Sequence, residues 1–343
     1  MMTLFDNIAI RGVVTAVPSY EDECNQAEYA RIMGEKRLKK HIRYTGIERR
    51  RVVMNGQKTS DLAIDAVRVL LQKTLWSADS VDILILITQA QDMLLPATSM
   101  FVHKAFPFKK DMLVFDINLG CSGYTTGLQT VAGLLQNFGS RALLIVGDIR
   151  KYNPEWKETG EWEKYLTDWL LLGSGISATA MEKANGNRMY GMQYTDGSGC
   201  MDIYKEYGHL SRMNGDAVFS FAINTVVDSV RQFMNDVHIA DHDVDYYVFH
   251  QAQKLILDNI RDLLEIPEEK ILISYQDFGN TSGASIPLTM CANGVQLGDG
   301  ARVLMCGFGV GLSWSAVYMD LAKDIPLGLI ESGHIYSYGQ EDH

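Results

Sequence analysis

The stretch Val114-Phe-Asp-Ile-Asn-Leu-Gly-Cys-Ser-Gly-Tyr124 decides the fold of this chain. Residues 114–117 are apolar or β-branched around one Asp, which is typical of a short buried strand. Gly120 allows a sharp backbone turn, and apolar residues then recur at helical spacing up to residue 135. The pattern predicts a strand, a tight turn and a helix, with Cys121 at or near the N-terminus of that helix.

The predicted position of Cys121 favours chemistry at its sulfur. Unpaired N–H groups and the helix dipole attract negative charge, so a helix N-terminus favours a thiolate. We therefore interpret Cys121 as a candidate nucleophile. The alternative is a buried, inert cysteine, because free cysteines are among the most buried residue types.

Strand-like and helix-like segments alternate along the rest of the chain. Buried strands are predicted over residues 8–17, 81–88 and 141–148, and helices over residues 21–40, 59–71 and about 96–105. Such alternation implies mostly parallel sheets with helices outside them. Residues 323–343 lose this periodicity and are predicted to form a surface tail.

Three segments recur in the same order about 160 residues later, which indicates a duplicated unit. Residues 81–91 resemble residues 244–253, residues 141–147 resemble residues 302–307, and the Cys121 turn corresponds to residues 279–285. Residues 170–181 would then be the first strand of the second copy.

The duplication predicts the architecture of the whole chain. We expect a five-layered α/β/α/β/α fold. Its N-terminal half would span residues 1–169 and carry the cysteine, and its C-terminal half would span residues 170–343.

Two polar residues of the second copy occupy turns on the same edge of the sheets as the Cys121 turn. His250 ends an apolar strand, and Asn280 lies in a Gly-Asn-Thr turn. Taken alone, each has an ordinary explanation, as a satisfied surface histidine and as a turn-forming asparagine. The repeat instead places all three side chains at the same edge of the sheets. A Cys with a His and an Asn is a known arrangement for thiol acyl chemistry.

A glycine-rich segment, residues 307–311, follows the last buried strand. It lacks the further glycine of the dinucleotide fingerprint and precedes a strand-like run. It is therefore either a plain tight turn or a close backbone approach to the reacting centre. In the second case its N–H groups would join that of Cys121 in holding an oxyanion.

Composition argues against several functional classes. The chain has 343 residues, 47% apolar content and a net charge of −11, so we expect no general nucleic-acid binding. No apolar run reaches about 18 residues, so no transmembrane helix is expected. The five scattered cysteines favour a cytoplasmic protein without a disulfide framework or a metal site.

Positive charge is nevertheless concentrated in one stretch, in which Glu48 is the only acidic residue. The alternatives are a solvated charged surface and a landing site for a phosphate-bearing or acidic partner. The basic residues of this stretch are Lys36, Arg37, Lys39, Lys40, Arg43, Arg49, Arg50 and Arg51.

Taken together, these residues resemble the β-ketoacyl-acyl-carrier-protein synthase III family of the thiolase-like superfamily. The resemblance extends over residues 8–321 and implies a thiolase-like fold. The matching pieces are residues 44–50 (Tyr-Thr-Gly-Ile-Glu-Arg-Arg), 116–124, 213–219, 250–253 (His-Gln-Ala-Gln), 279–285 and 307–314.

The resemblance also implies roles for the site residues. Cys121 would be the acylated nucleophile, and His250 and Asn280 would polarise the second thioester. The backbone N–H groups of Cys121 and Val310 would form the oxyanion hole. Phe308 would lie beside the reacting thioester.

The substrate-binding residues implied by the resemblance are less closely defined. Leu95 would shape the acyl pocket of the neighbouring subunit in a homodimer. Lys40, Arg43 and Lys254 would bind the substrate carrier. The chain departs from the family's primary enzymes near these basic residues, which leaves the donor open between an acyl-CoA and an acyl carrier protein. The pathway stays open between fatty-acid synthesis and specialised acyl metabolism.

The implied reaction is acyl transfer to Cys121 followed by decarboxylative condensation with a malonyl thioester. No cofactor is expected beyond the CoA or phosphopantetheine thioesters that serve as substrates. Two alternatives are an acyltransferase that passes the acyl group to an alcohol or amine without decarboxylation, and a catalytically silent partner subunit.

Overall fold

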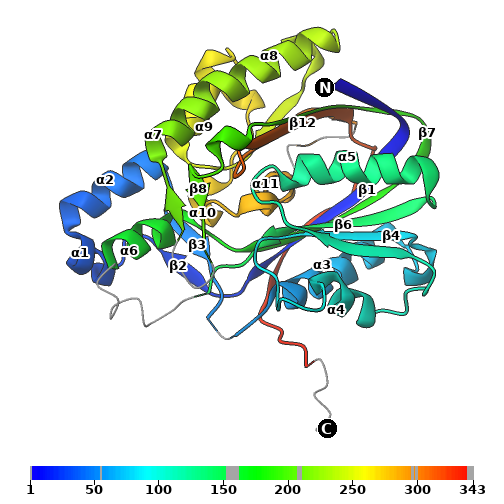
Figure 1. The fold of residues 1–343 in the computed structure, drawn as a ribbon, viewed down its shortest axis with the longest axis horizontal. Coiled ribbons are helices and arrows are strands. Elements are labelled where there is room, and N and C mark those ends of the chain that lie inside the picture. Colours follow the sequence, from blue (N-terminus) through cyan, green and yellow to red (C-terminus); the bar gives the residue numbers. More distant parts are fainter. Residues whose placement is uncertain are drawn as a thin grey trace.

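Helices and strands alternate through the chain (Figure 1). The computed structural model describes residues 2–54, 56–151, 162–206, 211–294, 297 and 300–337. The strands are β1 (Met2–Pro18), β2 (Glu21–Glu23), β3 (Arg49–Arg51), β4 (Ile83–Ile87), β5 (Leu113–Ile117), β6 (Arg141–Asp148), β7 (Gly175–Thr195), β8 (Ile203–Tyr204), β9 (Arg212–Met213), β10 (Tyr246–Phe249), β11 (Arg302–Gly309), β12 (Ser313–Asp320) and β13 (Leu327–Ser332). The helices are α1 (Ala27–Met33), α2 (Glu35–Thr45), α3 (Thr59–Thr74), α4 (Thr98–Lys104), α5 (Gly123–Asn137), α6 (Trp162–Leu171), α7 (Gly215–Ser220), α8 (Val227–Asp236), α9 (Lys254–Leu263), α10 (Tyr275–Phe278) and α11 (Ser285–Ala292).

Two groups of strands share the long strands β1 and β7. The first group runs β5-β4-β6-β7-β1-β13, and the second runs β10-β11-β12-β7-β1. In the first group β4 is parallel to β6, which is antiparallel to β7. In the second group β10 is parallel to β11, which is antiparallel to β12. The two groups therefore repeat one strand order, as a duplicated unit requires.

Helices lie outside and between the two groups of strands (Figure 1). Helices α3 and α4 cover one outer face, α8 and α9 cover the other, and α5 and α11 lie in the middle. Three apolar clusters fill the spaces between these layers. The predicted five-layered α/β fold is confirmed. None of the helices described is long and apolar enough to cross a membrane.

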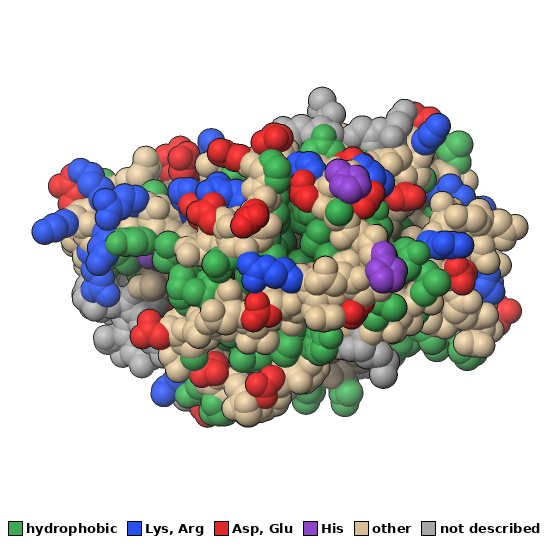
Figure 2. Space-filling model, turned by 90° about the horizontal axis from the view of Figure 1, so that it is seen from above, with side chains coloured by type: hydrophobic (Ala, Val, Ile, Leu, Met, Phe, Trp, Pro, Cys, Tyr) green, Lys and Arg blue, Asp and Glu red, His purple; other side chains and the backbone are tan. Residues whose placement is uncertain are grey.

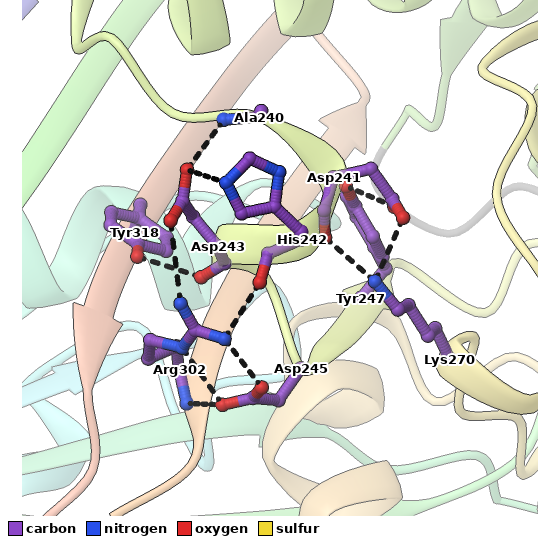
Figure 3. Close-up of polar contacts among 9 residues, drawn as sticks. All are labelled: Ala240, Asp241, His242, Asp243, Asp245, Tyr247, Lys270, Arg302 and Tyr318. Atoms are coloured by element: carbon purple, nitrogen blue, oxygen red, sulfur yellow. Dashed lines mark hydrogen bonds and ion pairs between the residues drawn. The ribbon is translucent and has the colours of Figure 1, made fainter.

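Corresponding Asp–Arg pairs, joined by backbone hydrogen bonds, lie at the start of β4 and β10. The Asp82 N–H donates to the carbonyl of Arg141 at 2.9 Å, and the Arg141 N–H donates to the Asp82 carboxylate at 3.1 Å. Asp245 and Arg302 repeat both contacts, at 2.9 and 2.8 Å. Figure 3 shows the Arg302 guanidinium between Asp243 and Asp245. These contacts support the duplication, while the boundary between residues 169 and 170 stays a prediction.

Several element predictions agree closely with the structure. Residues 8–17 lie in β1, residues 141–148 form β6, and residues 59–71 lie in α3. The assignment of residues 170–181 as the first strand of the second copy is wrong. Residues 175–182 pair antiparallel with β6, and it is residues 189–195 that pair with β12. An apolar run indicates burial but not strand direction, so the pattern could not distinguish the two parts of β7.

Two further predictions fail at the ends of the chain. The predicted helix over residues 21–40 is instead β2, α1 and α2, because Gly34 has a φ of +87° and interrupts the helix. The predicted surface tail is wrong for residues 327–332, which form β13 parallel to β1. The part of that tail at residues 338–343 lies outside the described residues.

Candidate active site

Cys121 lies between the end of β5 and the start of α5, as the sequence predicts. The Gly123 N–H donates to the Gly120 carbonyl at 2.7 Å and closes the turn around the cysteine. A Cβ atom at Gly120 would lie 2.4 Å from the Gln89 Oε1 atom. A side chain there would have to displace the Gln89 amide, and the cysteine lies two residues before the helix begins.

The glycine-rich segment at residues 307–311 packs directly against Cys121. A Cβ atom at Gly309 would lie 3.0 Å from the Cys121 Sγ atom. The Val310 backbone lowers the pKa of the thiol, and the hydroxyl oxygens of Ser122 and Ser313 are hydrogen-bonded at 2.7 Å. Of the two interpretations of this segment, the close approach to the reacting centre is therefore the correct one.

His250 follows β10 and is buried. Its Nδ1 atom lies 2.7 Å from the Ser285 hydroxyl oxygen, which also accepts the Gln251 N–H at 3.3 Å. The Ser285 hydroxyl has one proton that it can donate to Nδ1 while its oxygen accepts from Gln251. In that arrangement the neutral imidazole carries its proton on Nε2. The Phe308 ring stands edge-on to the imidazole, with the ring centres 5.5 Å apart.

Asn280 and Ser282 complete the site from the turn after α10. The Ser282 N–H donates to the Asn280 Oδ1 atom at 2.9 Å. The Ser282 side chain lowers the pKa of the Cys121 thiol, and its backbone raises the pKa of His250. Ser282 therefore lies beside all three predicted side chains, which are brought together.

The electrostatics of the site differ from the expectation of a thiolate. Burial raises the pKa of the Cys121 thiol, and the nearby Asp148 carboxylate raises it further. Hydrogen bonds from Val310 and Ser282 act in the opposite direction but are outweighed. Burial also lowers the pKa of His250 to about 4. Without substrate, both side chains are neutral at pH 7, so the predicted thiolate is wrong for this state.

The predicted substrate-binding residues lie at different places. Phe308 is beside His250, and its place beside the reacting thioester stays a prediction. Leu95 is 79% exposed on the loop before α4. Lys40 and Arg43 are exposed on α2, and Lys254, at the start of α9, is paired with Asp258 at 2.6 Å.

The basic stretch separates into two parts with different environments. Arg49, Arg50 and Arg51 make ion pairs with acidic residues, and Arg50 is completely buried. A landing site for a partner requires exposed basic residues, so that prediction is wrong for Arg50. Lys36, Lys39, Lys40 and Arg43 remain exposed on α2. Figure 2 shows Lys and Arg side chains gathered at the left end, where α1 and α2 lie in Figure 1.

Sequence reasoning missed Ser282 and Asp148. Ser282 belongs to the quoted turn at residues 279–285 but follows the more conspicuous asparagine. It has a φ of +53°, which is rare for a residue other than glycine, and no local pattern indicates such a value. Asp148 ends β6 and accepts hydrogen bonds from Thr88 and Gln89.

Comparison with known proteins agrees with this geometry. Residues 234–321 match the model of the 3-oxoacyl-(acyl-carrier-protein) synthase III C-terminal family. The β-ketoacyl-(acyl-carrier-protein) synthase III of Clostridium perfringens is 31% identical over 297 residues, which cover 81% of this chain and 89% of the relative. Synthase III 1 of Halalkalibacterium halodurans is 32% identical over 278 residues, with 80% and 86% covered.

A solved structure extends the similarity over nearly the whole chain. The 3-oxoacyl-(acyl-carrier protein) synthase of Burkholderia xenovorans superposes with a TM-score of 0.88 at 26% identity, covering 97% of this chain and 99% of that one. The fold is therefore thiolase-like, as expected. The chain belongs to the β-ketoacyl-acyl-carrier-protein synthase III family.

Proposed function

We propose that this chain loads an acyl group onto Cys121 and condenses it with a malonyl thioester to give a β-ketoacyl thioester. The observation that carries the proposal is that the neighbouring residues Phe308 and Gly309 lie against His250 and Cys121. The turn that holds Asn280 on the Ser282 N–H continues to Ser285, whose hydroxyl contacts His250 Nδ1. A nucleophile from one half of the chain and two hydrogen-bond donors from the other thus share one site.

In the first half-reaction the Cys121 sulfur attacks the carbonyl carbon of an acyl thioester. The backbone N–H groups of Cys121 and Val310 are the proposed oxyanion donors, and such donors contribute about 3 kcal/mol each. The carrier thiol leaves with the proton of the cysteine, and the acyl group remains on Sγ.

In the second half-reaction a malonyl thioester loses CO₂ and becomes an enolate. The His250 Nε2–H and the Asn280 Nδ2–H are the proposed donors to the enolate oxygen, while Nδ1 and Oδ1 have partners within the protein. The enolate carbon attacks the acyl carbonyl. The new C–C bond replaces the C–S bond to Cys121, which takes up a proton.

The proposal also covers the residues that bind the carrier and the oligomeric state. The exposed basic residues of α2 and the neighbouring Lys254 would receive the acidic or phosphate-bearing carrier, whether CoA or a carrier protein. The active form would be a homodimer, because β5 ends the first group of strands and Leu95 is exposed on the loop before α4, which packs against β5.

The test separates the two half-reactions. Cys121→Ala should abolish acyl loading, which intact-protein mass spectrometry detects with a panel of acyl-CoAs and acyl carrier proteins. Asn280→Ala should load normally but lose at least about 100-fold in CO₂ release and condensation, because one enolate donor is missing.

Two outcomes would refute this reading. Wild-type protein that loads but never releases CO₂ from a malonyl thioester would instead be a non-decarboxylative acyltransferase. Equal loss of loading and condensation in Asn280→Ala would contradict the division of roles between the cysteine and the asparagine.

A further inference from the structure

Arg50 is a fully buried charged residue outside the site described above. It is 0% exposed, at the centre of β3. Its guanidinium binds the Asp22 carboxylate through Nη2 and the Trp169 carbonyl through Nη1. It also lies over the Trp169 ring, 5.1 Å from the ring centre. A buried charge requires such partners, because an unpaired one is strongly destabilising. Both terminal nitrogens of the guanidinium are bound, while its buried Nε–H has no hydrogen-bond partner among the described residues.

The partner of Arg50 is itself held rigidly. Asp22 pairs with Arg50 across β2 and β3. Its carboxylate accepts hydrogen bonds from the Tyr29 hydroxyl at 2.8 Å, the Gln26 amide at 2.7 Å and the Trp169 indole at 3.1 Å. The orientation of the arginine is thus fixed by side chains from β2, α1 and α6.

The arginine contacts the turn that carries Asn280. A Cβ atom at Gly279 would lie 3.1 Å from the Arg50 Cγ atom and 3.1 Å from the Leu171 carbonyl oxygen. Gly279 therefore packs directly on the arginine stem.

The segment that Arg50 binds through Trp169 also holds the Asn280 backbone. The Asn280 N–H donates to the Leu171 carbonyl at 3.0 Å, and the Gly173 N–H donates to the Asn280 carbonyl at 2.9 Å. The Ser174 N–H donates to the carbonyl of Arg51, beside Arg50 in β3, at 2.8 Å. Residues 169–174 are thus held between β3 on one side and the Asn280 turn on the other.

We propose that Arg50, anchored by Asp22, is a positioning residue for the Asn280 carboxamide. It fixes residues 169–174 and the Gly279 backbone, so that Asn280 Oδ1 stays on the Ser282 N–H and Nδ2 is presented to the enolate. This inference rests on the proposed function, and it assigns Arg50 to condensation rather than to acyl loading, because no contact described here joins Arg50 to Cys121.

The test compares Arg50→Lys with Arg49→Lys, the same substitution one position earlier in β3. A lysine retains the charge for Asp22 but has no planar fork with which to bind Asp22 and the Trp169 carbonyl together. Arg49 pairs with Asp277 at the surface, and a lysine can keep that pair. Arg50→Lys should load Cys121 within about twofold of wild type but lose about tenfold or more in the kcat of condensation. Arg49→Lys should keep both rates.

A purely structural role predicts a different result. Loading and condensation would then fall by the same factor, in proportion to the folded fraction, and this would overturn the proposal. An unchanged kcat of condensation in folded Arg50→Lys would also overturn it.

A second variant decides the matter if Arg50→Lys does not fold. Gly279→Ala leaves the Asp22 pair intact but places a methyl group against the Arg50 stem at a φ of +64°. It should show the same selective loss of condensation, and equal losses in both half-reactions would count against the proposal. Failure of the wild-type protein to condense would refute the proposed function instead, so the two failures are distinguishable.

Discussion

At the scale of single residues, the site is built from two neutral groups. Burial raises the pKa of Cys121 and lowers that of His250 to about 4, so neither carries a charge at pH 7. A raised thiol pKa means that the thiolate fraction at pH 7 is smaller than for a free cysteine. As long as the pH stays below that pKa, each unit of increase in pH raises the thiolate fraction tenfold.

Alkylation of Cys121 by iodoacetamide should therefore be slow at neutral pH. We expect its rate to rise continuously between about pH 6 and pH 9, because the thiolate is the reactive form. Peptide mass spectrometry resolves Cys121 from Cys200, which is exposed and serves as the internal reference. A rate that reaches its plateau below pH 7 would show that Cys121 is a stable thiolate after all.

The sequence predicts the three site residues but not the residues that orient them. Cys121, His250 and Asn280 each lie in a recognisable turn of a repeated unit, so the topology brings their side chains together. Arg50 looks like one member of a charged surface stretch. Its burial depends on Asp22 and Trp169, which come from other elements, and no local pattern contains that pairing.

At the scale of elements, the glycine-rich segment after β11 determines how closely backbone can approach the sulfur. Gly309 has a φ of +153°, which L-residues rarely adopt, and its Cα faces the Cys121 side chain. Any side chain at this position would have to displace either the cysteine or the proposed oxyanion donor at Val310.

Gly309→Ala should therefore reduce acyl loading by at least about 100-fold, the order of effect expected when an oxyanion donor is displaced. The added Cβ would lie 2.7 Å from the Cys121 Cβ atom. Gly186→Ala is the matched control, because its φ is +86° but no atom lies within 4 Å of the added methyl group. Comparable loss of loading in both variants would assign the effect to backbone strain rather than to crowding at the sulfur.

Hydrophobic periodicity predicts where a strand lies in the sequence but not which strands pair with it. Residues 141–148 were predicted as a strand and form β6 with identical bounds, because a continuous apolar run between polar ends is unambiguous. The path of β7 through both groups of strands and the pairing of β13 with β1 were not predicted. Both depend on which distant strand lies alongside, and that information is not local.

At the scale of the whole molecule, the strand β5 lies at an open edge of the sheet in a single chain. Among the described residues, β5 pairs with β4 alone, and Phe115 and Ile117 in it are only half-buried. The loop before α4 exposes Met93, Leu94 and Leu95. An open strand edge beside exposed apolar side chains favours association, so we expect two copies to meet here.

Leu95→Asp tests this assembly without disturbing the folded chain, because Leu95 is 79% exposed. Light scattering should give wild-type protein twice the chain mass of 38.4 kDa, and the variant should dissociate because a carboxylate would be buried at the interface. Acyl loading should fall with dissociation if Leu95 completes the pocket of the neighbouring subunit. Leu263→Asp, on the α9 side of the molecule and 40% exposed, should change neither mass nor loading. A fully active wild-type monomer, or a Leu95→Asp dimer with an unchanged acyl preference, would rule out this role for the loop.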